Sequence, residues 1–324
     1  MKILIILPNW LGDAIMATPA IELLSKLYPS AEFTFVGSFV SIDAMKQHPL
    51  CKRVIVDETK KASSRLLATY KLAKELGEFS FAISFRNQLH SSLLLRFTST
   101  VVCIARSAWH SKLLLSHTPN IKTNKHLVEQ YVELAMTNED GFDSHVPNLK
   151  LHSKAKKFDR PTLGVNAGAT YGSAKRWYPE RFAEVAATFS DKYDIIIFGG
   201  KNEVETSQEI QEHLVSRGVK NFTNLAGKTT IEELCSSIAG CSLFITNDSG
   251  PMHVAAAYQV PTIAIFGPTK YKETSPWNNT KSTIVRHDME CSPCMKRECP
   301  LNHHECMTSI TAIEVIQAVK ELDL

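Results

Sequence analysis

The chain begins with Met1-Lys2-Ile3-Leu4-Ile5-Ile6-Leu7-Pro8-Asn9-Trp10-Leu11-Gly12-Asp13, and this run sets the architecture that follows. Its apolar residues predict a buried strand at 2–7, and Gly12 permits a sharp turn into a helical stretch at 14–27. Only five apolar residues precede Pro8, fewer than the roughly 7–15 in the apolar region of a signal peptide. We therefore expect the first strand of a cytosolic protein.

The same alternation of short apolar runs and amphipathic stretches continues along the chain, as in βαβ units around parallel sheets. Further strands are expected at 32–37, 53–56, 81–84 and 101–104 and, after a Lys-rich segment at 151–160, at 162–166, 194–198, 243–246 and 262–266. Helices are expected between them, among them 179–190, 203–217, 231–239 and 251–258. We predict an α/β fold of two Rossmann-like domains, 1–155 and 161–308, whose strand ends face one cleft.

Length and charge exclude several other classes of protein. With 324 residues, 44% of them apolar, the chain can bury a core in each of two domains, so disorder is excluded. A net charge of +3 is far from the strongly basic composition of a nucleic-acid binder. No run reaches the roughly 20 apolar residues that span a bilayer.

The charge is divided unevenly along the chain. Up to Arg160 there are 21 Lys+Arg and 14 Asp+Glu, a net +7, whereas the remainder has 15 and 19, a net −4. A basic half suits an anionic partner or an anionic membrane surface. An unevenly charged, solvated surface is an equal alternative.

Asp13 stands directly after the turn at Gly12, at the expected mouth of the cleft. Its carboxylate could act as a general base if it lies within reach of the proton that it removes. Aspartate is also a favoured N-cap residue of helices, so both roles stay open from position alone.

A loop rich in small residues, 166–179, follows the first strand of the second half. Its glycines let backbone N–H groups approach an anion, Thr170 can add a hydroxyl donor, and Lys175 supplies a positive charge. The loop is not a Walker A motif, and no G-x-G-x-x-G occurs in the chain, which argues against a nicotinamide dehydrogenase. A flexible Gly/Ser loop with a solvated lysine is the alternative.

A second loop, 245–253, lies between a strand and a helix. Pro251 fits the first helical turn, where N–H groups and the helix dipole can hold a phosphate. An aspartate there could bind a sugar hydroxyl, cap the helix, or do both. The candidate positions of this loop are Asp248, Ser249, Gly250 and His253.

Two weaker candidates lie on other loops at the same sheet edge. Glu203 follows a glycine pair at a strand end and could accept hydrogen bonds from ribose hydroxyls. Thr229 precedes the helix at 231–239, for which Thr230 is the expected cap. The convergence of these loops indicates a nucleotide-diphosphate site.

Four of the eight cysteines share one 16-residue window, C-x2-C-x4-C-x6-C, together with His303 and His304: Cys291, Cys294, Cys299 and Cys306. The first pair has the spacing of a zinc module, but the second half matches no common one. Three interpretations stay open: a structural zinc site, a disulfide, which a reducing cytosol disfavours, and a packed Cys/His-rich loop.

Together, the motifs W-L-G-D at 10–13, G-A-T-Y-G-S-A-K-R-W at 168–177, N-D-S-G-P-M-H at 247–253 and the Cys/His window resemble the ADP-heptose:lipopolysaccharide heptosyltransferases, most closely the heptosyltransferase II branch. The resemblance runs over nearly the whole chain. It implies the two-domain GT-B glycosyltransferase fold, with an N-terminal acceptor-binding domain and a C-terminal domain for the nucleotide sugar. It also implies that the last helix, within 309–324, packs back on the first domain.

By this resemblance the catalytic aspartate is Asp13, and the donor-binding positions are Thr170, Lys175, Glu203, Thr229, Asp248, Ser249, Gly250 and His253. The implied reaction is inverting transfer of L-glycero-D-manno-heptose from ADP-heptose to the heptose-Kdo inner core of lipopolysaccharide or lipooligosaccharide, adding the second heptose. Another inner-core acceptor position, or another sugar-nucleotide-dependent GT-B transfer, is the alternative.

The resemblance implies no metal and no cofactor for the reaction, because Lys175, the Ser249/Gly250 backbone and the helix dipole can stabilise the departing diphosphate. The implied partners are ADP-heptose and a lipid A-linked Kdo/heptose acceptor, without nucleic acid. The enzyme is then expected in the cytoplasm, in peripheral contact with the inner membrane.

Overall fold

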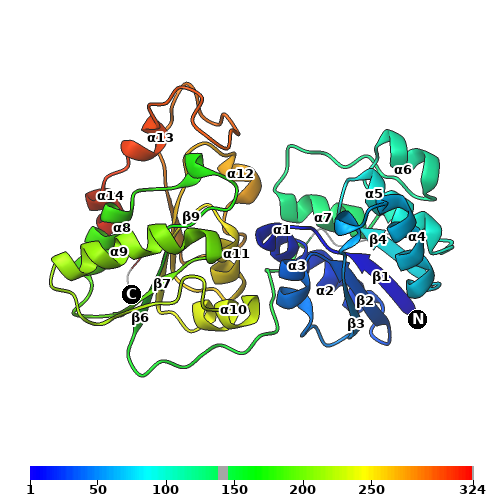
Figure 1. Ribbon diagram of the computed structural model, residues 1–324, viewed down its shortest axis with the longest axis horizontal. Coiled ribbons are helices and arrows are strands. Elements are labelled where there is room, and N and C mark those ends of the chain that lie inside the picture. The colour runs from blue at the N-terminus through cyan, green and yellow to red at the C-terminus, as the bar shows by residue number, and fades with distance from the viewer. Residues whose placement is uncertain (138–144, 323–324) are drawn as a thin grey trace. The chain divides into compact units, whose positions relative to one another are not determined.

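The computed structural model describes residues 1–137 and 145–322, which form two compact units, Met1–His152 and Ser153–Leu324 (Figure 1). Each unit has its own parallel sheet, flanked by helices. The predicted α/β class with two Rossmann-like domains is therefore confirmed.

The first unit holds a five-stranded parallel sheet in the order β3-β2-β1-β4-β5. Its strands are β1 (Lys2–Ile6), β2 (Glu32–Gly37), β3 (Cys51–Val56), β4 (Phe81–Ser84) and β5 (Cys103–Ala105). Its helices are α1 (Leu11–Met16), α2 (Thr18–Leu27), α3 (Phe39–Met45), the short η1 (Thr59–Lys61), α4 (Arg65–Leu76), α5 (Leu89–Phe97), α6 (Trp109–Leu114) and α7 (Leu127–Ala135). The central strand β1 is buried on both faces, which explains its uninterrupted apolar run.

The second unit holds a six-stranded parallel sheet in the order β11-β10-β9-β6-β7-β8. Its strands are β6 (Thr162–Asn166), β7 (Asp194–Phe198), β8 (Phe222–Asn224), β9 (Leu243–Asn247), β10 (Thr262–Ile265) and β11 (Ser282–Val285). Its helices are η2 (Ser173–Lys175), α8 (Pro179–Thr188), η3 (Lys201–Glu203), α9 (Val204–Ser216), α10 (Ile231–Ala239), α11 (Gly250–Ala257), α12 (Tyr271–Thr274), α13 (Glu305–Thr308) and α14 (Ala312–Glu321).

In each sheet the strand order reverses at one place, between β1 and β4 in the first unit and between β6 and β9 in the second. Open α/β sheets bind ligands beyond the carboxyl ends of the strands at such a switch point. The loops that follow these four strands are therefore the places to look for a site.

The predicted strands are confirmed, with bounds shifted by no more than two residues. The edge strands β8 and β11 were missed because they are short and only partly buried, so they lack a clear apolar run. The predicted helix at 14–27 is two helices, α1 and α2, which meet at Ala17.

The Lys-rich segment at 151–160, predicted to be a linker, belongs to the second unit from Ser153 onward. Its backbone is bonded to α10, since Lys156 N–H donates to the Ser236 carbonyl (2.9 Å) and Ser236 Oγ donates to the Lys154 carbonyl (2.7 Å). The unit boundary therefore precedes these lysines.

This boundary changes the charge comparison. Residues 1–152 contain 17 Lys+Arg and 13 Asp+Glu, a net +4, and residues 153–324 contain 19 and 20, a net −1. The contrast of +7 with −4 thus depended largely on assigning the Lys-rich segment to the first half.

That the last helix packs back on the first domain stays a prediction, and within the second unit its apolar face is already covered. Helix α14 packs on α8 and β11 within the second unit. Its apolar side chains Val315, Ala318 and Val319 are buried in that unit's core, so the helix has already used its apolar face. Residues 323–324 of the predicted segment lie outside the described residues.

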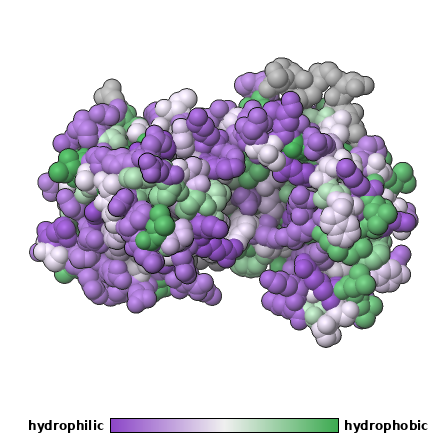
Figure 2. Space-filling view, turned by 90° about the horizontal axis from the view of Figure 1, so that it is seen from above, coloured by the Kyte–Doolittle hydropathy of each residue, from purple (hydrophilic) through white to green (hydrophobic). Residues whose placement is uncertain are grey.

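None of the helices described is long and apolar enough to cross a membrane. On the face drawn in Figure 2, hydrophilic residues predominate and hydrophobic residues form smaller areas among them.

Candidate active site

Two asparagines at the ends of β6 and β9 tie together the loops at the second sheet's switch point. Asn247 Nδ2 donates to the Ala167 carbonyl (2.6 Å), and its Oδ1 accepts the N–H of Trp177 (3.1 Å). Asn166 Nδ2 lies 3.3 Å from Ser249 Oγ. Both side chains are buried, so these bonds fix the two loops to each other. Neither asparagine was predicted to have a role, although a buried amide at a strand end is the available signal.

Lys175 and Asp248 form a buried ion pair where these loops meet. Lys175 Nζ lies 2.6 Å from Asp248 Oδ2 and 3.3 Å from the Asp248 carbonyl oxygen. The ammonium also lies over the ring of Tyr171, 4.9 Å from its centroid. The carboxylate accepts a hydrogen bond from Thr269 Oγ1 (2.6 Å). Because Ser249 is the N-cap residue of α11, the Asp248 side chain orients the lysine instead of capping the helix.

Glu203 contacts the same loop from the neighbouring strand. Its Oε2 accepts the N–H of Gly200 (2.8 Å), and its carboxyl group lies against the backbone of Gly168. A Cβ at Gly168 would lie 2.1 Å from that carboxyl group, so the glycine lets the carboxyl group keep this position. The predicted site residues Glu203, Lys175 and Asp248 are thus brought together through the loop that begins after β6.

The N-terminus of α11 lies at the same switch point, immediately after Asp248. Gly250 is its first helical residue, Pro251 follows, and the buried His253 stands one turn further on. The amide N–H groups of this first turn are the anion-binding element predicted from the sequence.

The two threonines have different surroundings. Thr170 is exposed on the loop after β6, and Thr229 is half-buried before α10. Thr230 caps α10 as predicted, because its Oγ1 accepts the N–H of Glu233 (3.1 Å) while Glu233 Oε2 accepts the N–H of Thr230 (2.8 Å).

Asp13 lies in the first unit, in the first turn of α1. The N-cap residue of this helix is Trp10, so the capping alternative for Asp13 is wrong. Burial raises the pKa of the neighbouring Tyr131 phenol, and the negative charge of Asp13 adds to that shift. The helix dipole favours the ionised carboxylate at this position, which is the form that a general base requires.

A buried cluster at the switch point of the first sheet was not predicted. Arg86 follows β4, donates from Nε to the Leu7 carbonyl (2.6 Å), and has Nη1 3.0 Å from Asp57 Oδ2. His90 Nε2 lies 3.0 Å from the same oxygen. Burial alone would raise the pKa of Asp57, but hydrogen bonds from His90 and Thr59 and the charge of Arg86 bring it well below its usual range.

Within the described residues, Arg86 Nη2 is buried without a hydrogen-bond partner. A guanidinium donor is therefore left over at the edge of the first sheet. The residues of this cluster come from separate segments of the chain, so no single motif predicted it.

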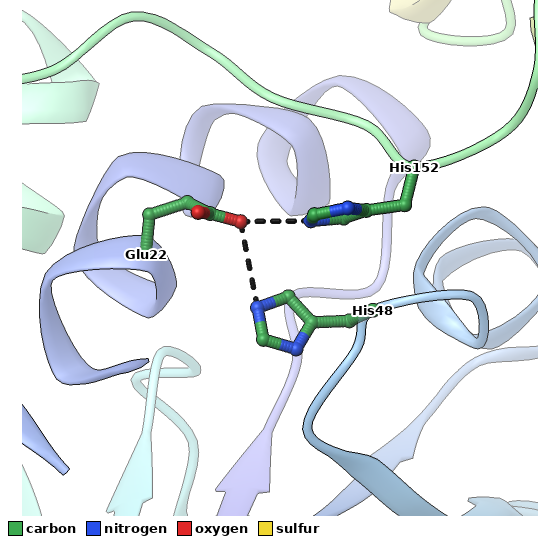
Figure 3. Close-up of side chains that lie close together, drawn as sticks. All are labelled: Glu22, His48 and His152. Atoms are coloured by element: carbon green, nitrogen blue, oxygen red, sulfur yellow. Dashed lines mark hydrogen bonds and ion pairs between the residues drawn. The ribbon is translucent and has the colours of Figure 1, made fainter. Parts of the chain in front are cut away.

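Glu22, His48 and His152 form the one described group whose ligand atoms all lie within 4.8 Å of one another (Figure 3). Glu22 Oε1 lies 2.8 Å from His152 Nε2 and 3.4 Å from His48 Nε2. The N–H of Leu50 donates to His48 Nδ1 (3.2 Å), so the ring proton of His48 is on Nε2 and is donated to Glu22. Its Nε2 has no lone pair for a metal, and the cluster is a set of hydrogen bonds that holds the end of the first unit to α2.

Comparisons with known proteins agree on one family. The model of glycosyltransferase family 9 (heptosyltransferase) matches residues 69–305. A lipooligosaccharide heptosyltransferase 2 of Campylobacter jejuni is 41% identical, covering 99% of this chain and 98% of the relative. The lipopolysaccharide heptosyltransferase 2 of Escherichia coli K12 is 26% identical over 99% of this chain and 98% of its own. The solved structure of an E. coli ADP-heptose LPS heptosyltransferase II matches with a TM-score of 0.82 at 25% identity, covering 99% of this chain and 98% of that one. The chain belongs to glycosyltransferase family 9, the heptosyltransferases.

Proposed function

We propose that this enzyme transfers heptose from ADP-heptose to the heptose-Kdo inner core of a lipopolysaccharide or lipooligosaccharide, adding the second heptose. The observation that carries the proposal is the 41% identity, over 99% of the chain, to a lipooligosaccharide heptosyltransferase 2. The ion pair and the helix N-terminus at the second switch point support it, since both suit a nucleotide diphosphate.

The proposed reaction inverts the anomeric centre. The Asp13 carboxylate takes the proton of an acceptor hydroxyl, and the oxygen attacks the anomeric carbon from the face opposite ADP. The bond from that carbon to the ADP oxygen breaks, and ADP leaves with the electron pair. The residues of the second unit then stabilise the negative charge that develops on the diphosphate.

Lys175 is the residue that we assign to the diphosphate. Its ammonium has three N–H donors, of which the Asp248 carboxylate and carbonyl use two. One donor remains for a phosphate oxygen, and the ion pair keeps it at the sheet edge before the donor arrives. Glu203, which is held beside Gly168, is assigned to the ribose hydroxyls.

In the first unit, Arg86 is assigned to the anionic acceptor. Its unpartnered Nη2 lies at the sheet edge where acceptors of this fold class are expected. The Asp57 carboxylate and the Leu7 carbonyl hold the rest of the guanidinium, so the free donor is fixed in direction.

A membrane-contacting surface is proposed on the first unit, over α4 and α6, which both pack against α5. Large apolar side chains are exposed there, with Trp109 73%, Leu113 79% and Leu66 58% accessible. The basic residues Arg65 and Lys112, next to Leu66 and Leu113 in the sequence, are exposed as well. Apolar side chains interspersed with cations suit the interface of an anionic bilayer.

A nucleotide panel tests the proposed donor. We expect ADP, but not UDP, GDP or CMP, to stabilise the protein, by about 2.7 kcal/mol at a ligand concentration of 100 times Kd. Lys175→Met should abolish the ADP response, whereas Lys220→Met should keep it, because Lys220 is exposed at the opposite, amino edge of the sheet before β8. A response to UDP alone would contradict the heptose assignment. Transfer itself is measured as ADP release from ADP-heptose with a monoheptosyl inner-core acceptor, and no release would reject the proposed reaction.

A further inference from the structure

The four clustered cysteines line one small cavity in the second unit. This cavity has a volume of about 20 Å³, and its walls include Cys291, Cys294, Cys299 and Cys306. Such a volume holds a single water-sized sphere. All eight cysteines lie in the described part of the chain and are free thiols, so the disulfide interpretation is wrong for this structure.

The segment around the cavity is unusual. Residues 286–304, between β11 and α13, contain no helix or strand, and a structureless segment of this length is uncommon in a compact domain. Three of its residues that are not glycine adopt left-handed backbone conformations: Met295 (φ 55°), Asn302 (φ 58°) and His304 (φ 52°). Such conformations persist only where the surroundings hold them.

Around the cavity the Cys306 thiol is buried, whereas Cys291, Cys294 and Cys299 are partly exposed.

The neighbouring His304 is already committed elsewhere. Its Nε2 lies 2.9 Å from the Ala174 carbonyl and therefore carries the proton, and its Nδ1 accepts from the Tyr178 hydroxyl (3.0 Å). The ring has no lone pair left for a metal. His303, which also lines the cavity, is committed in the same way, because its Nδ1 accepts the N–H of Glu305 (3.0 Å) and its Nε2 therefore carries the proton. The thiols are then the remaining ligand set, and four sulfurs match the tetrahedral coordination of a structural site.

We propose that Cys291, Cys294, Cys299 and Cys306 bind one divalent transition-metal ion, zinc or iron(II), in a tetrahedral thiolate site. Each thiol loses its proton to solvent as its sulfur binds the ion. In the structure no three of the four sulfurs lie within 4.8 Å of one another, so the segment and Cys306 must draw together on binding. Three of the ligands lie in the segment without helix or strand, and Cys306 lies in the first turn of α13.

The ion acts on the donor loop through the segment that it orders. The Arg297 carbonyl accepts the N–H of Ala174 (3.0 Å), and the Met295 carbonyl accepts the hydroxyl of Tyr171 (2.7 Å). These two donors flank the turn that leads to Lys175. This step rests on the proposed function, because it assigns the ion the task of stabilising the diphosphate loop.

Elemental analysis of the untagged, full-length protein tests the site. We expect about one zinc or iron ion per chain, and the element found decides which of the two metals binds. Cys294→Ser and Cys299→Ser should lose it, whereas Cys51→Ser, which changes a thiol of β3 in the first unit, should retain it. Cobalt substitution should give thiolate-to-cobalt charge-transfer bands in the wild type and in Cys51→Ser only.

A second measurement does not depend on the folding of any variant. Removing the metal from the wild-type protein should expose the four clustered thiols to alkylation, with Cys51 as the internal reference. The proposal would be overturned if the isolated protein contained neither metal and if the reduced protein still bound neither after incubation with zinc or with iron(II). A protein that binds the metal but not ADP would refute the proposed donor and leave the metal site standing.

Discussion

Asp13 is the side chain on which the proposed chemistry depends most directly, because no other group has been assigned to the acceptor proton. Asp13→Asn keeps the shape of the side chain and removes its basicity. We expect turnover to fall by about 10²–10⁴-fold. ADP affinity should be unchanged, because the assigned donor residues belong to the second unit. ADP release and nucleotide titration measure the two effects separately.

The matched control is Asp159→Asn, which removes an exposed carboxylate without an assigned role. It should leave both turnover and ADP binding unchanged. Near wild-type turnover of Asp13→Asn would show that another group takes the proton.

Glu22 makes the stability of the first unit dependent on pH. Burial by itself raises the pKa of this carboxyl, but hydrogen bonds from His152, His48 and Lys150 bring it well below its usual range. A lowered native-state pKa means that the ionised cluster stabilises the fold at neutral pH. This contribution is lost as the pH falls below the ordinary value of about 4.3.

Glu22→Gln should therefore destabilise the protein by on the order of 1.5–3 kcal/mol near neutral pH, because it weakens hydrogen bonds to a charged acceptor. The difference from wild type should shrink as the pH is lowered through 4, which urea unfolding at several pH values will measure. Glu78→Gln, an exposed carboxylate before β4, should show no such difference. A difference independent of pH would mean that packing alone explains the effect of Glu22.

At the scale of elements, the contact between the loop after β6 and Glu203 offers a matched pair of glycines. A Cβ at Gly168 would lie 2.1 Å from the Glu203 carboxyl group, whereas one at Gly200 would be 3.5 Å from its Oε2, an ordinary contact. Gly168→Ala should displace the Glu203 carboxyl group and weaken ADP binding, with little loss of stability, because the displaced atoms are the end of a flexible side chain. Gly200→Ala should change neither ADP binding nor stability. Isothermal titration with ADP and thermal unfolding compare the two variants, and equal behaviour would refute the role of this contact.

The elements themselves were largely predictable, and their contacts were not. Strands such as β1 and β9 are buried on both faces, so their apolar runs are visible in the sequence. The loops that carry Lys175 and Asp248 follow from the rule that sites lie after strand ends. The ion pair between them joins residues 73 positions apart, and no local pattern encodes such a partner.

A pattern within one segment does not identify the partner of that segment. The amphipathic pattern of α14 predicts that one face is buried, but not which surface buries it. The cluster of Asp57, Arg86 and His90 was missed because each residue alone resembles a solvated charge. Sequence periodicity indicates which residues are buried, but tertiary packing determines which surface covers them.

For the whole molecule, a local surface supports the proposed membrane contact better than the net charge does. With the boundary at Ser153 the first unit carries only +4, too little to support the proposed membrane contact by itself. In this proposal the exposed apolar residues Trp109 and Leu113 supply part of the binding, and Arg65 and Lys112 add electrostatic attraction. Binding should then require both an anionic headgroup and these two apolar side chains.

Sedimentation with vesicles tests this requirement. Wild-type protein should bind vesicles that contain phosphatidylglycerol more strongly than phosphatidylcholine vesicles, and less strongly as salt is added. Replacing both Trp109 and Leu113 by Ser should weaken binding at least about tenfold, since burying such a side chain contributes about 1.5–3 kcal/mol. Ile313→Ser removes an equally exposed apolar residue, 73% accessible on α14 of the second unit, and should bind like wild type. If the Ile313 variant loses as much affinity as the double variant, binding is nonspecific and the surface over α4 and α6 is not the contact.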